Sequence, residues 1–118
     1  YEVLPGYLKA FDVCMIPFRQ DDLFSLNCSP LKLYEYLATG IPIVSSNLNG
    51  VKFCKSLIKI ARSKEQFQQH IKDALQEKNE LREKRIKFSE AHSWKKRAVE
   101  VIGLLEEALN RRIELETF

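Results

Sequence analysis

Four residues near the start of one predicted helix have types and spacing that suit the binding of an anion. They are Ser29, Pro30, Lys32 and Glu35, in the run S-P-L-K-L-Y-E-Y-L-A-T-G at residues 29–40. Serine followed by proline favours a helix start, because the hydroxyl can accept a backbone N–H and proline has none to satisfy. The helix dipole favours an acid in the first turn, so a lysine at position 32 is unfavourable in an empty helix start. A phosphate docked on the free N–H groups of that turn would make Lys32 favourable instead. Glu35, almost one turn later, could then accept hydrogen bonds from ribose hydroxyls; the alternative is an ordinary solvated helix face.

The elements that must hold these residues alternate between helix and strand. Gly40 ends the helix with a left-handed turn, and the apolar run after it predicts a buried strand at residues 41–45. Spacings of three and four place one set of helix side chains toward the core: Leu33, Tyr34, Leu37 and Ala38. The other elements expected in this half are a short helix at 5–10, a strand at 12–16, a polar loop at 19–28, a helical turn at 51–55 and a strand at 57–61.

The three predicted strands are separated by helical crossovers, which pair strands in parallel. The sequence therefore predicts an α/β fold with a short, Rossmann-like parallel sheet. Ligands of such sheets bind at the carboxyl ends of the strands. We expect the loop before Ser29 and the turn that carries Asn47, Asn49 and Gly50 to face the same region.

The second half of the chain is predicted to be helical, with structural helices. Ser63 and Gln66 form a capping box for a helix whose apolar face holds Phe67, Ile71, Ala74 and Leu75. A helix at residues 79–91 is rich in basic residues, namely Arg82, Lys84, Arg85 and Lys87. Ser93 caps a third helix with a regular apolar stripe, made of Trp94, Ala98, Val101, Ile102, Leu105, Leu109 and Ile113.

Three segments of the chain carry a family resemblance. They are L-P-G-Y-L-K-A-F-D-V-C-M-I-P-F at residues 4–18, S-P-L-K-L-Y-E-Y-L-A-T-G-I-P-I-V-S-S at 29–46 and H-S-W at 92–94. Together they resemble the C-terminal domain of GT-B glycosyltransferases, especially the family 4 type often called group 1. The resemblance covers nearly the whole chain, and the pairing of the two long segments at this spacing is far more specific than a lone glycine motif.

The resemblance implies a donor site for a nucleotide-diphosphate sugar, with no separate cofactor. We expect Ser29, Leu31 and Lys32 to hold the diphosphate, where the helix dipole and the lysine stabilise the charge that develops on the leaving phosphate. The family uses two glutamates separated by seven residues. Glu35 matches the second, which binds the ribose, and Asn27 stands where the first would approach the sugar. An amide can still bind a sugar hydroxyl but supplies no negative charge. By resemblance the transfer would retain the anomeric configuration.

The chain corresponds to part of one GT-B domain. A complete enzyme has two Rossmann-like domains, and these 118 residues hold four glycines and no G-x-G-x-x-G turn. We therefore expect residues 1–118 to form a single incomplete C-terminal domain, with an α/β nucleotide-binding part at 1–62 and a helical part at 63–118. The acceptor, which could be lipid- or polysaccharide-linked, and any base would come from the missing domain, so the isolated piece should be inactive.

Composition favours a globular cytoplasmic protein. Hydrophobic residues make up 45% and charged residues 30% of the chain, and no apolar run reaches the length of a membrane span. Cys14, Cys28 and Cys54 form no C-x-x-C pair, which suggests free thiols in a reducing compartment. His70, expected in solvent, and His92, expected beside a helix cap, have no metal ligand at the usual spacing, so no metal site is predicted.

Most alternatives to an enzymatic function come from the second half of the chain. The net charge of +3 is small, and acids interrupt the basic stretch at 78–97, which disfavours nucleic acid. The same stretch could contact an anionic membrane surface. The last helix could form a non-catalytic interaction module, whereas the resemblance implies that it packs back against the parent enzyme. An unpaired edge on the strand at 12–16 would also favour self-association.

Overall fold

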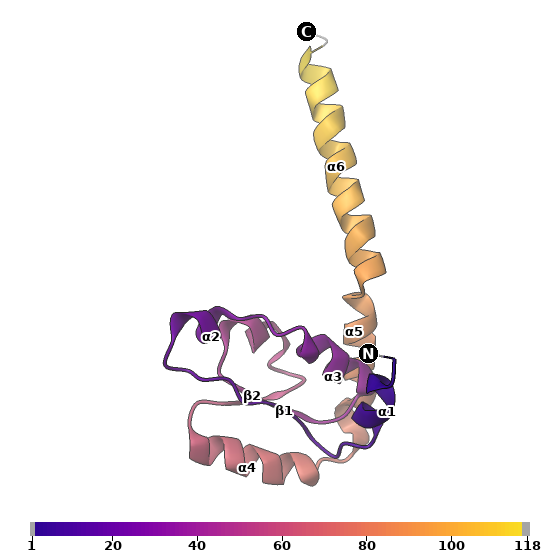
Figure 1. Ribbon diagram of the computed structural model, residues 1–118. Coiled ribbons are helices and arrows are strands. Elements are labelled where there is room, and N and C mark those ends of the chain that lie inside the picture. The colour runs from indigo at the N-terminus through magenta and orange to yellow at the C-terminus, as the bar shows by residue number, and fades with distance from the viewer. Residues whose placement is uncertain (1, 117–118) are drawn as a thin grey trace.

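The structure is a computed structural model that describes residues 2–116, with side chains described to residue 113. Figure 1 shows a compact α/β part from which one long helix projects, so that the molecule extends 64 × 33 × 27 Å. The elements in chain order are α1 (Leu4–Lys9), β1 (Cys14–Ile16), α2 (Leu23–Asn27), α3 (Lys32–Thr39), β2 (Ile43–Ser46), the 3-10 helix η1 (Asn49–Cys54), β3 (Lys59–Ala61), α4 (Lys64–Leu75), the 3-10 helix η2 (Asn79–Leu81), α5 (Arg82–Ala91) and α6 (Trp94–Glu116).

The sheet has three parallel strands in the order β1-β2-β3. Cys14 pairs with Ile43, and Val44 pairs with Lys59. This confirms the predicted α/β class and the parallel sheet, although the strands at the two edges are shorter than the apolar runs that predicted them. β1 forms one edge of the sheet, as expected.

The core lies between the sheet and the helices on its two faces. α3 places Leu33 and Leu37 in it, together with Ile16 and Ile43 from the strands. α5 packs against α3, and α4 packs against β2 and β3 on the other face (Figure 1). The buried faces of the helices are narrower than predicted, because Ala38 and Leu75 are exposed in the structure.

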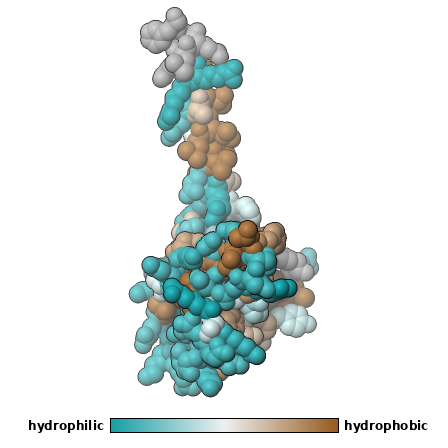
Figure 2. All heavy atoms as spheres, turned by 90° about the vertical axis from the view of Figure 1, so that its left-hand side faces the viewer, coloured by the Kyte–Doolittle hydropathy of each residue, from teal (hydrophilic) through white to brown (hydrophobic). Residues whose placement is uncertain are grey.

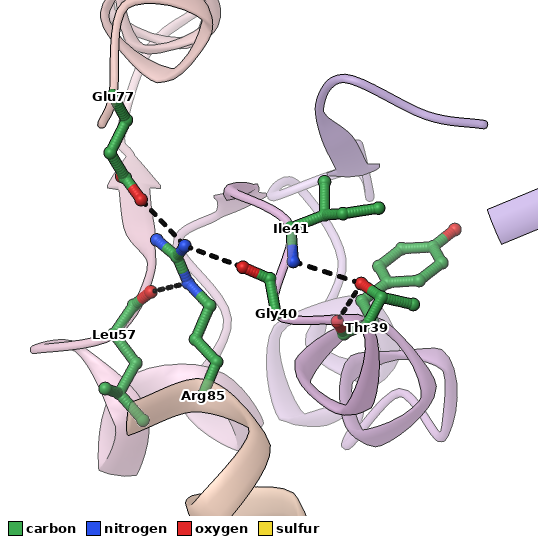
Figure 3. A network of polar contacts seen from close by, with 7 residues as sticks. Thr39, Gly40, Ile41, Leu57, Glu77 and Arg85 are labelled. Atoms are coloured by element: carbon green, nitrogen blue, oxygen red, sulfur yellow. Dashed lines mark hydrogen bonds and ion pairs between the residues drawn. The ribbon is translucent and has the colours of Figure 1, made fainter. Parts of the chain in front are cut away.

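A buried arginine joins three segments beneath the core (Figure 3). The Arg85 side chain is only 2% exposed, and its Nε donates to the Leu57 carbonyl at 2.8 Å. Its Nη1 donates to the Gly40 carbonyl at 3.1 Å and lies 2.7 Å from the Glu77 carboxylate. The sequence grouped Arg85 with the other basic residues of its helix, and did not predict this burial. Its stem and charge instead connect α5 to the end of α3.

The prediction was right for the end of α3 and wrong for its start. Gly40 adopts the left-handed conformation with φ of 73°, which confirms the predicted helix stop. Ser29 is not the N-cap, so that prediction was wrong: the helix begins at Lys32, with Leu31 at the cap position and no side-chain cap bond. The carbonyls of Pro30 and Leu31 instead accept from the N–H groups three residues later and form a tight first turn.

The segment before α3 is not the continuous loop that its polarity predicted. Asp22 caps α2 because its carboxylate accepts from the Ser25 N–H at 2.8 Å. Leu23 and Phe24 lie exposed on this short helix. Asp22 followed by a short helical segment is an N-cap signal, but the polarity of residues 19–28 predicted only a loop.

The start of α4 matches its prediction. The Gln66 N–H donates to the Ser63 hydroxyl at 3.1 Å, and the Gln66 side chain accepts from the Arg62 N–H at 2.7 Å. His70, expected in solvent, is instead only 23% exposed, with Nδ1 lying 3.7 Å from the Asp73 carboxylate. The His70 ring is therefore partly buried against the rest of the protein.

α6 projects away from the sheet, and its apolar stripe is exposed along its described length. Ser93 precedes it as a cap, with its hydroxyl 3.4 Å from the Lys96 N–H. Figure 2 shows hydrophobic atoms on the column that α6 forms above the α/β part. Residues 94–113 of the stripe are therefore uncovered in this structure, and the packing against the parent enzyme that the resemblance implies stays a prediction. Within residues 2–116, no helix has both the length and the apolar character needed to cross a membrane.

Candidate functional site

A pocket of about 520 Å³ lies between the start of α3 and the junction of α5 with α6. It brings together three of the residues predicted to bind a nucleotide-sugar, Ser29, Leu31 and Glu35. The other lining residues come from α3 and from the end of α5 and the start of α6: Tyr34, Ser89, His92, Ser93, Trp94 and Arg97. Residues about sixty positions apart in the sequence therefore share one site.

A group of stacked rings supports the floor of this pocket. Tyr34 stacks on Phe53 with ring centroids 6.1 Å apart, and Phe53 stacks on Phe88 at 5.9 Å. Phe88 in turn stacks on His92 at 4.1 Å. Because these rings come from α3, η1 and α5, they hold α3 and α5, which both line the pocket, in fixed positions relative to each other.

The histidine in this group is held in one tautomer. His92 Nδ1 lies 2.8 Å from the Phe88 carbonyl, which can only accept, so Nδ1 carries the proton. The other ring nitrogen can therefore accept a hydrogen bond while the ring is neutral. His92 ends α5, as expected of a residue beside a cap, but it also lines the pocket, which the sequence did not predict.

Arg97 supplies a positive charge to the pocket from the first turn of α6. Its Nη2 donates to the Tyr34 hydroxyl at 3.0 Å, and its Nε donates to the His92 carbonyl at 3.4 Å. The guanidinium carbon lies 5.5 Å from the centre of the Tyr34 ring. The arginine therefore ties α6 to α3 by one edge of its guanidinium.

Lys32, predicted to bind the diphosphate, is not among the residues that line the pocket. Its Nζ lies 4.7 Å from the centre of the Phe18 ring, a cation–π contact. It also occupies the first helical position rather than the third, because α3 begins later than predicted. Packing over Phe18 thus gives this lysine a structural role that the sequence did not suggest.

Asn27, predicted to approach the sugar, belongs to a neighbouring polar chain. Its amide nitrogen donates to the Leu23 carbonyl at 2.9 Å, and its oxygen accepts from Asn49 at 2.8 Å. Asn49 in turn accepts from Lys52 Nζ at 2.6 Å. These contacts hold Asn27 beside η1 and outside the lining of the pocket.

The turn at Gly50 lies against the loop that leads into the site, as predicted. A Cβ on Gly50 would come within 2.6 Å of Ser29 Cα and still closer to the Cys28 carbonyl. Only a residue without a side chain allows this approach. The close contact fixes the position of Ser29 relative to η1, at the carboxyl end of the sheet.

Glu35 lies between two pockets. Besides the first, it lines a second of about 580 Å³ between α1 and α3, together with Leu8, Thr39 and Arg82. A carboxylate at this place could face a ligand on either side of α3. The Thr39 hydroxyl is engaged with the backbone, since it donates to the Tyr36 carbonyl at 2.7 Å and accepts from the Ile41 N–H.

The acids of the preceding loop have partners within the loop. The Arg19 guanidinium, 2.6 Å from the Asp21 carboxylate, lowers the pKa of Asp21, and the Ser25 N–H lowers the pKa of Asp22. Across the part of the chain that the structure describes, no three His, Cys, Asp or Glu side chains are grouped so as to hold a metal ion. The loop thus organises α2 and keeps both carboxylates ionised over a wide pH range.

The residues that the sequence analysis missed at this site lie at the junction of α5 and α6. The H-S-W segment contributes to the family resemblance and predicts a helix start, but it did not predict that His92, Ser93 and Trp94 line the pocket. Helical spacing does place Arg97 above Ser93, one turn later. What the sequence could not supply is the direction in which α6 leaves α5.

Comparison with known proteins gives one local similarity to report. The chain is 38% identical over 45 residues to the Bacillus subtilis (strain 168) protein named "Putative teichuronic acid biosynthesis glycosyltransferase TuaH". That segment is 38% of this chain and 11% of the relative, so the chain spans only a small part of the relative's length. No family model and no solved structure matches the chain. The similarity connects this α/β chain to a glycosyltransferase, at that general level.

Proposed function

We propose that this chain is the donor-binding part of a glycosyltransferase and that the pocket at the start of α3 binds a nucleotide-diphosphate sugar. The observation that carries the proposal is the joint presence of Ser29, Leu31 and Glu35 in one pocket with the charge of Arg97. The local identity to a glycosyltransferase supports it independently.

The α3 start suits a diphosphate for a physical reason. Its first-turn N–H groups and the helix dipole both favour negative charge. In the proposed reaction, the bond between the anomeric carbon and a phosphate oxygen breaks, and its electron pair goes to the departing nucleoside diphosphate. The acceptor oxygen forms the new bond to that carbon and loses its proton. The positive end of α3 would stabilise the diphosphate charge as it develops.

Glu35 would hold the ribose by accepting hydrogen bonds from its hydroxyls. It lies in the first turn of α3, on the wall of the same pocket. Asn27, beside η1, would contact the sugar only if the sugar extends past Ser29 toward that chain of amides. The acceptor and any base would come from the rest of the enzyme, and the activity of the whole enzyme is part of the proposal.

The test is a titration of isotopically labelled chain with UDP, GDP, ADP and dTDP, followed through backbone amide shifts. Binding of one nucleotide should move the amides from Leu31 to Glu35, and Glu35→Ala should weaken that binding. Glu106→Ala, which removes an exposed acid from α6, is the matched control and should bind as the wild type does. Absence of any selective shift would contradict the proposal.

A second candidate function is favoured by the exposure of α6. The apolar stripe from Val101 to Leu109 remains accessible in the structure, which suits a helix that packs on another surface. Sedimentation of the full chain beside a Leu105→Lys, Leu109→Lys variant tests this: loss of association without loss of the α/β fold indicates an interface. Contact of the basic helices with an anionic membrane, and self-association through the β1 edge, stay predictions.

A further inference from the structure

We infer that Arg97 of α6 is the residue that binds the phosphates in this pocket, and that the nucleoside diphosphate is gripped between α3 and α6. The inference rests on the proposed function and adds to it a residue outside the helix that the sequence singled out. If α6 is displaced, the contact between Arg97 and the phosphates is the one that is lost.

Arg97 has the right position for this role. It lines the same pocket as Ser29 and Leu31, at the start of α3, so an anion inside would lie between a guanidinium and a helix N-terminus. Both groups favour negative charge, and neither requires the other to move. The hydrogen bond from Arg97 to the Tyr34 hydroxyl holds the start of α6 beside α3.

The guanidinium also has donors to spare. It carries five N–H groups, and the contacts with Tyr34 and the His92 carbonyl use two of them. Those two contacts hold one edge and limit rotation of the side chain. The remaining edge can give the paired hydrogen bonds that arginine makes with phosphate oxygens, without a large further loss of side-chain entropy.

The alternative cation is Lys32, which has a competing contact. Its Nζ lies over the Phe18 ring at 4.7 Å and would have to leave that ring to reach the pocket. Lys96, next to Arg97, is exposed and is not among the pocket-lining residues. The geometry therefore separates one cation that faces the ligand from two that contribute charge only from outside.

The experiment compares nucleoside diphosphates with the corresponding nucleosides on the full chain. UDP, GDP, ADP and dTDP are titrated beside uridine, guanosine, adenosine and thymidine, and affinities are taken from amide shifts. Arg97→Gln is measured beside Arg97→Lys, Lys96→Gln and Lys32→Gln. Lys96→Gln removes the same charge from the same helix turn and is the matched control.

The expected result is selective for phosphate. Arg97→Gln should weaken the preferred diphosphate about tenfold, the effect of losing one charge-assisted contact, and should leave the nucleoside unchanged. Arg97→Lys should fall between the wild type and Arg97→Gln, because it keeps the charge and loses the fork. Lys96→Gln and Lys32→Gln should each change the affinity less than about twofold, as expected for screened charges.

Other outcomes overturn the inference in recognisable ways. Equal weakening of diphosphate and nucleoside would mean that Arg97 only holds α6 against Tyr34. Equal weakening by Lys96→Gln would reduce the effect to net charge. Wild-type binding by Arg97→Gln, with weakened binding by Glu35→Ala, would reject Arg97 and keep the proposed function. No binding of any diphosphate would reject both.

Discussion

Helices α3 and α6 are both amphipathic, yet α3 buries its apolar face in the core and α6 leaves its apolar face exposed along its described length. Leu33 and Leu37 of α3 are fully buried, whereas Leu105 and Leu109 of α6 are 59% and 58% exposed. α3 ends at Thr39, and after the turn at Gly40 the chain enters β2 at Ile43, so the sheet lies within reach of the apolar face of α3. α6 follows α5 with two residues between them and leads away from the sheet (Figure 1). Periodicity thus identifies an apolar face, and the connection decides what can cover it.

The largest expected difference between the two regions concerns their arginines. Arg85→Met should lower the free energy of unfolding by about 3–5 kcal/mol, because it leaves the Glu77 carboxylate and two backbone carbonyls buried without their partner. Arg111→Met on α6 removes an exposed pair with Glu107 and should unfold at the wild-type denaturant concentration. Urea unfolding followed by circular dichroism checks both.

A double variant sharpens this prediction. Arg85→Met combined with Glu77→Leu removes both charges, so part of the lost stability should return. If the double variant is no more stable than Arg85→Met alone, the carbonyl contacts to Gly40 and Leu57 account for the cost instead of the unpaired carboxylate.

Matched leucines test the comparison at the level of packing. Leu37→Ala should cost about 2–5 kcal/mol through lost burial and a residual cavity. Leu105→Ala should change the stability of the α/β part by less than about 0.5 kcal/mol. Thermal unfolding of the two variants at several protein concentrations is the measurement. A large, concentration-dependent loss in Leu105→Ala would mean that α6 is covered by a second copy in solution.

Two glycines should respond with opposite sign. Gly40→Ala forces a side chain into the left-handed region, with its Cβ 2.6 Å from Arg82 Cγ, and should destabilise by about 1–3 kcal/mol. Gly103 lies inside α6, and a Cβ added there would meet no atom within 4 Å, so Gly103→Ala should raise helix stability by about 0.5–1 kcal/mol. Helical ellipticity and melting curves measured side by side would show the two signs.

A pH dependence is also expected from the packed region. Burial raises the pKa of the Cys14 and Cys54 thiols to about 11. In the unfolded chain a thiol loses its proton near about pH 8.5. Between these values the unfolded state binds fewer protons, so the free energy of unfolding should fall as pH rises from about 9 to 11. Cys54→Ala should show a shallower fall over that range, and an equal slope would contradict the assignment.

The parts of the fold that the sequence predicted are those with a local signal. Gly40 stops a helix because of its own backbone freedom, and Ser63 caps the next helix with the residues beside it. The parallel sheet follows from the alternation of short apolar runs with helices. Each of these depends on residues a few positions apart, which a sequence displays directly.

The parts that it did not predict depend on distant partners. Arg85 reads as one of several basic residues, and only the carbonyls of Gly40 and Leu57 make it a core residue. Ser29 was predicted to cap α3, but it lies against Gly50, and α3 begins with a tight turn that has no side-chain cap. At the candidate site, Ser29, Leu31 and Glu35 were found from the motif, and Arg97 was missed because its contact with Tyr34 spans 63 residues.

The Arg85 contacts also set an order of events during synthesis on the ribosome. The Gly40 carbonyl waits 45 residues, and the Leu57 carbonyl 28 residues, for the guanidinium that will bind them. A nascent chain that has not yet released α5 therefore holds a sheet and an α3 whose outer face has no cover. Such an intermediate exposes apolar surface and is the species on which chaperones act. Translation pauses that occur before α5 has left the ribosome would prolong that exposure, and later pauses would not.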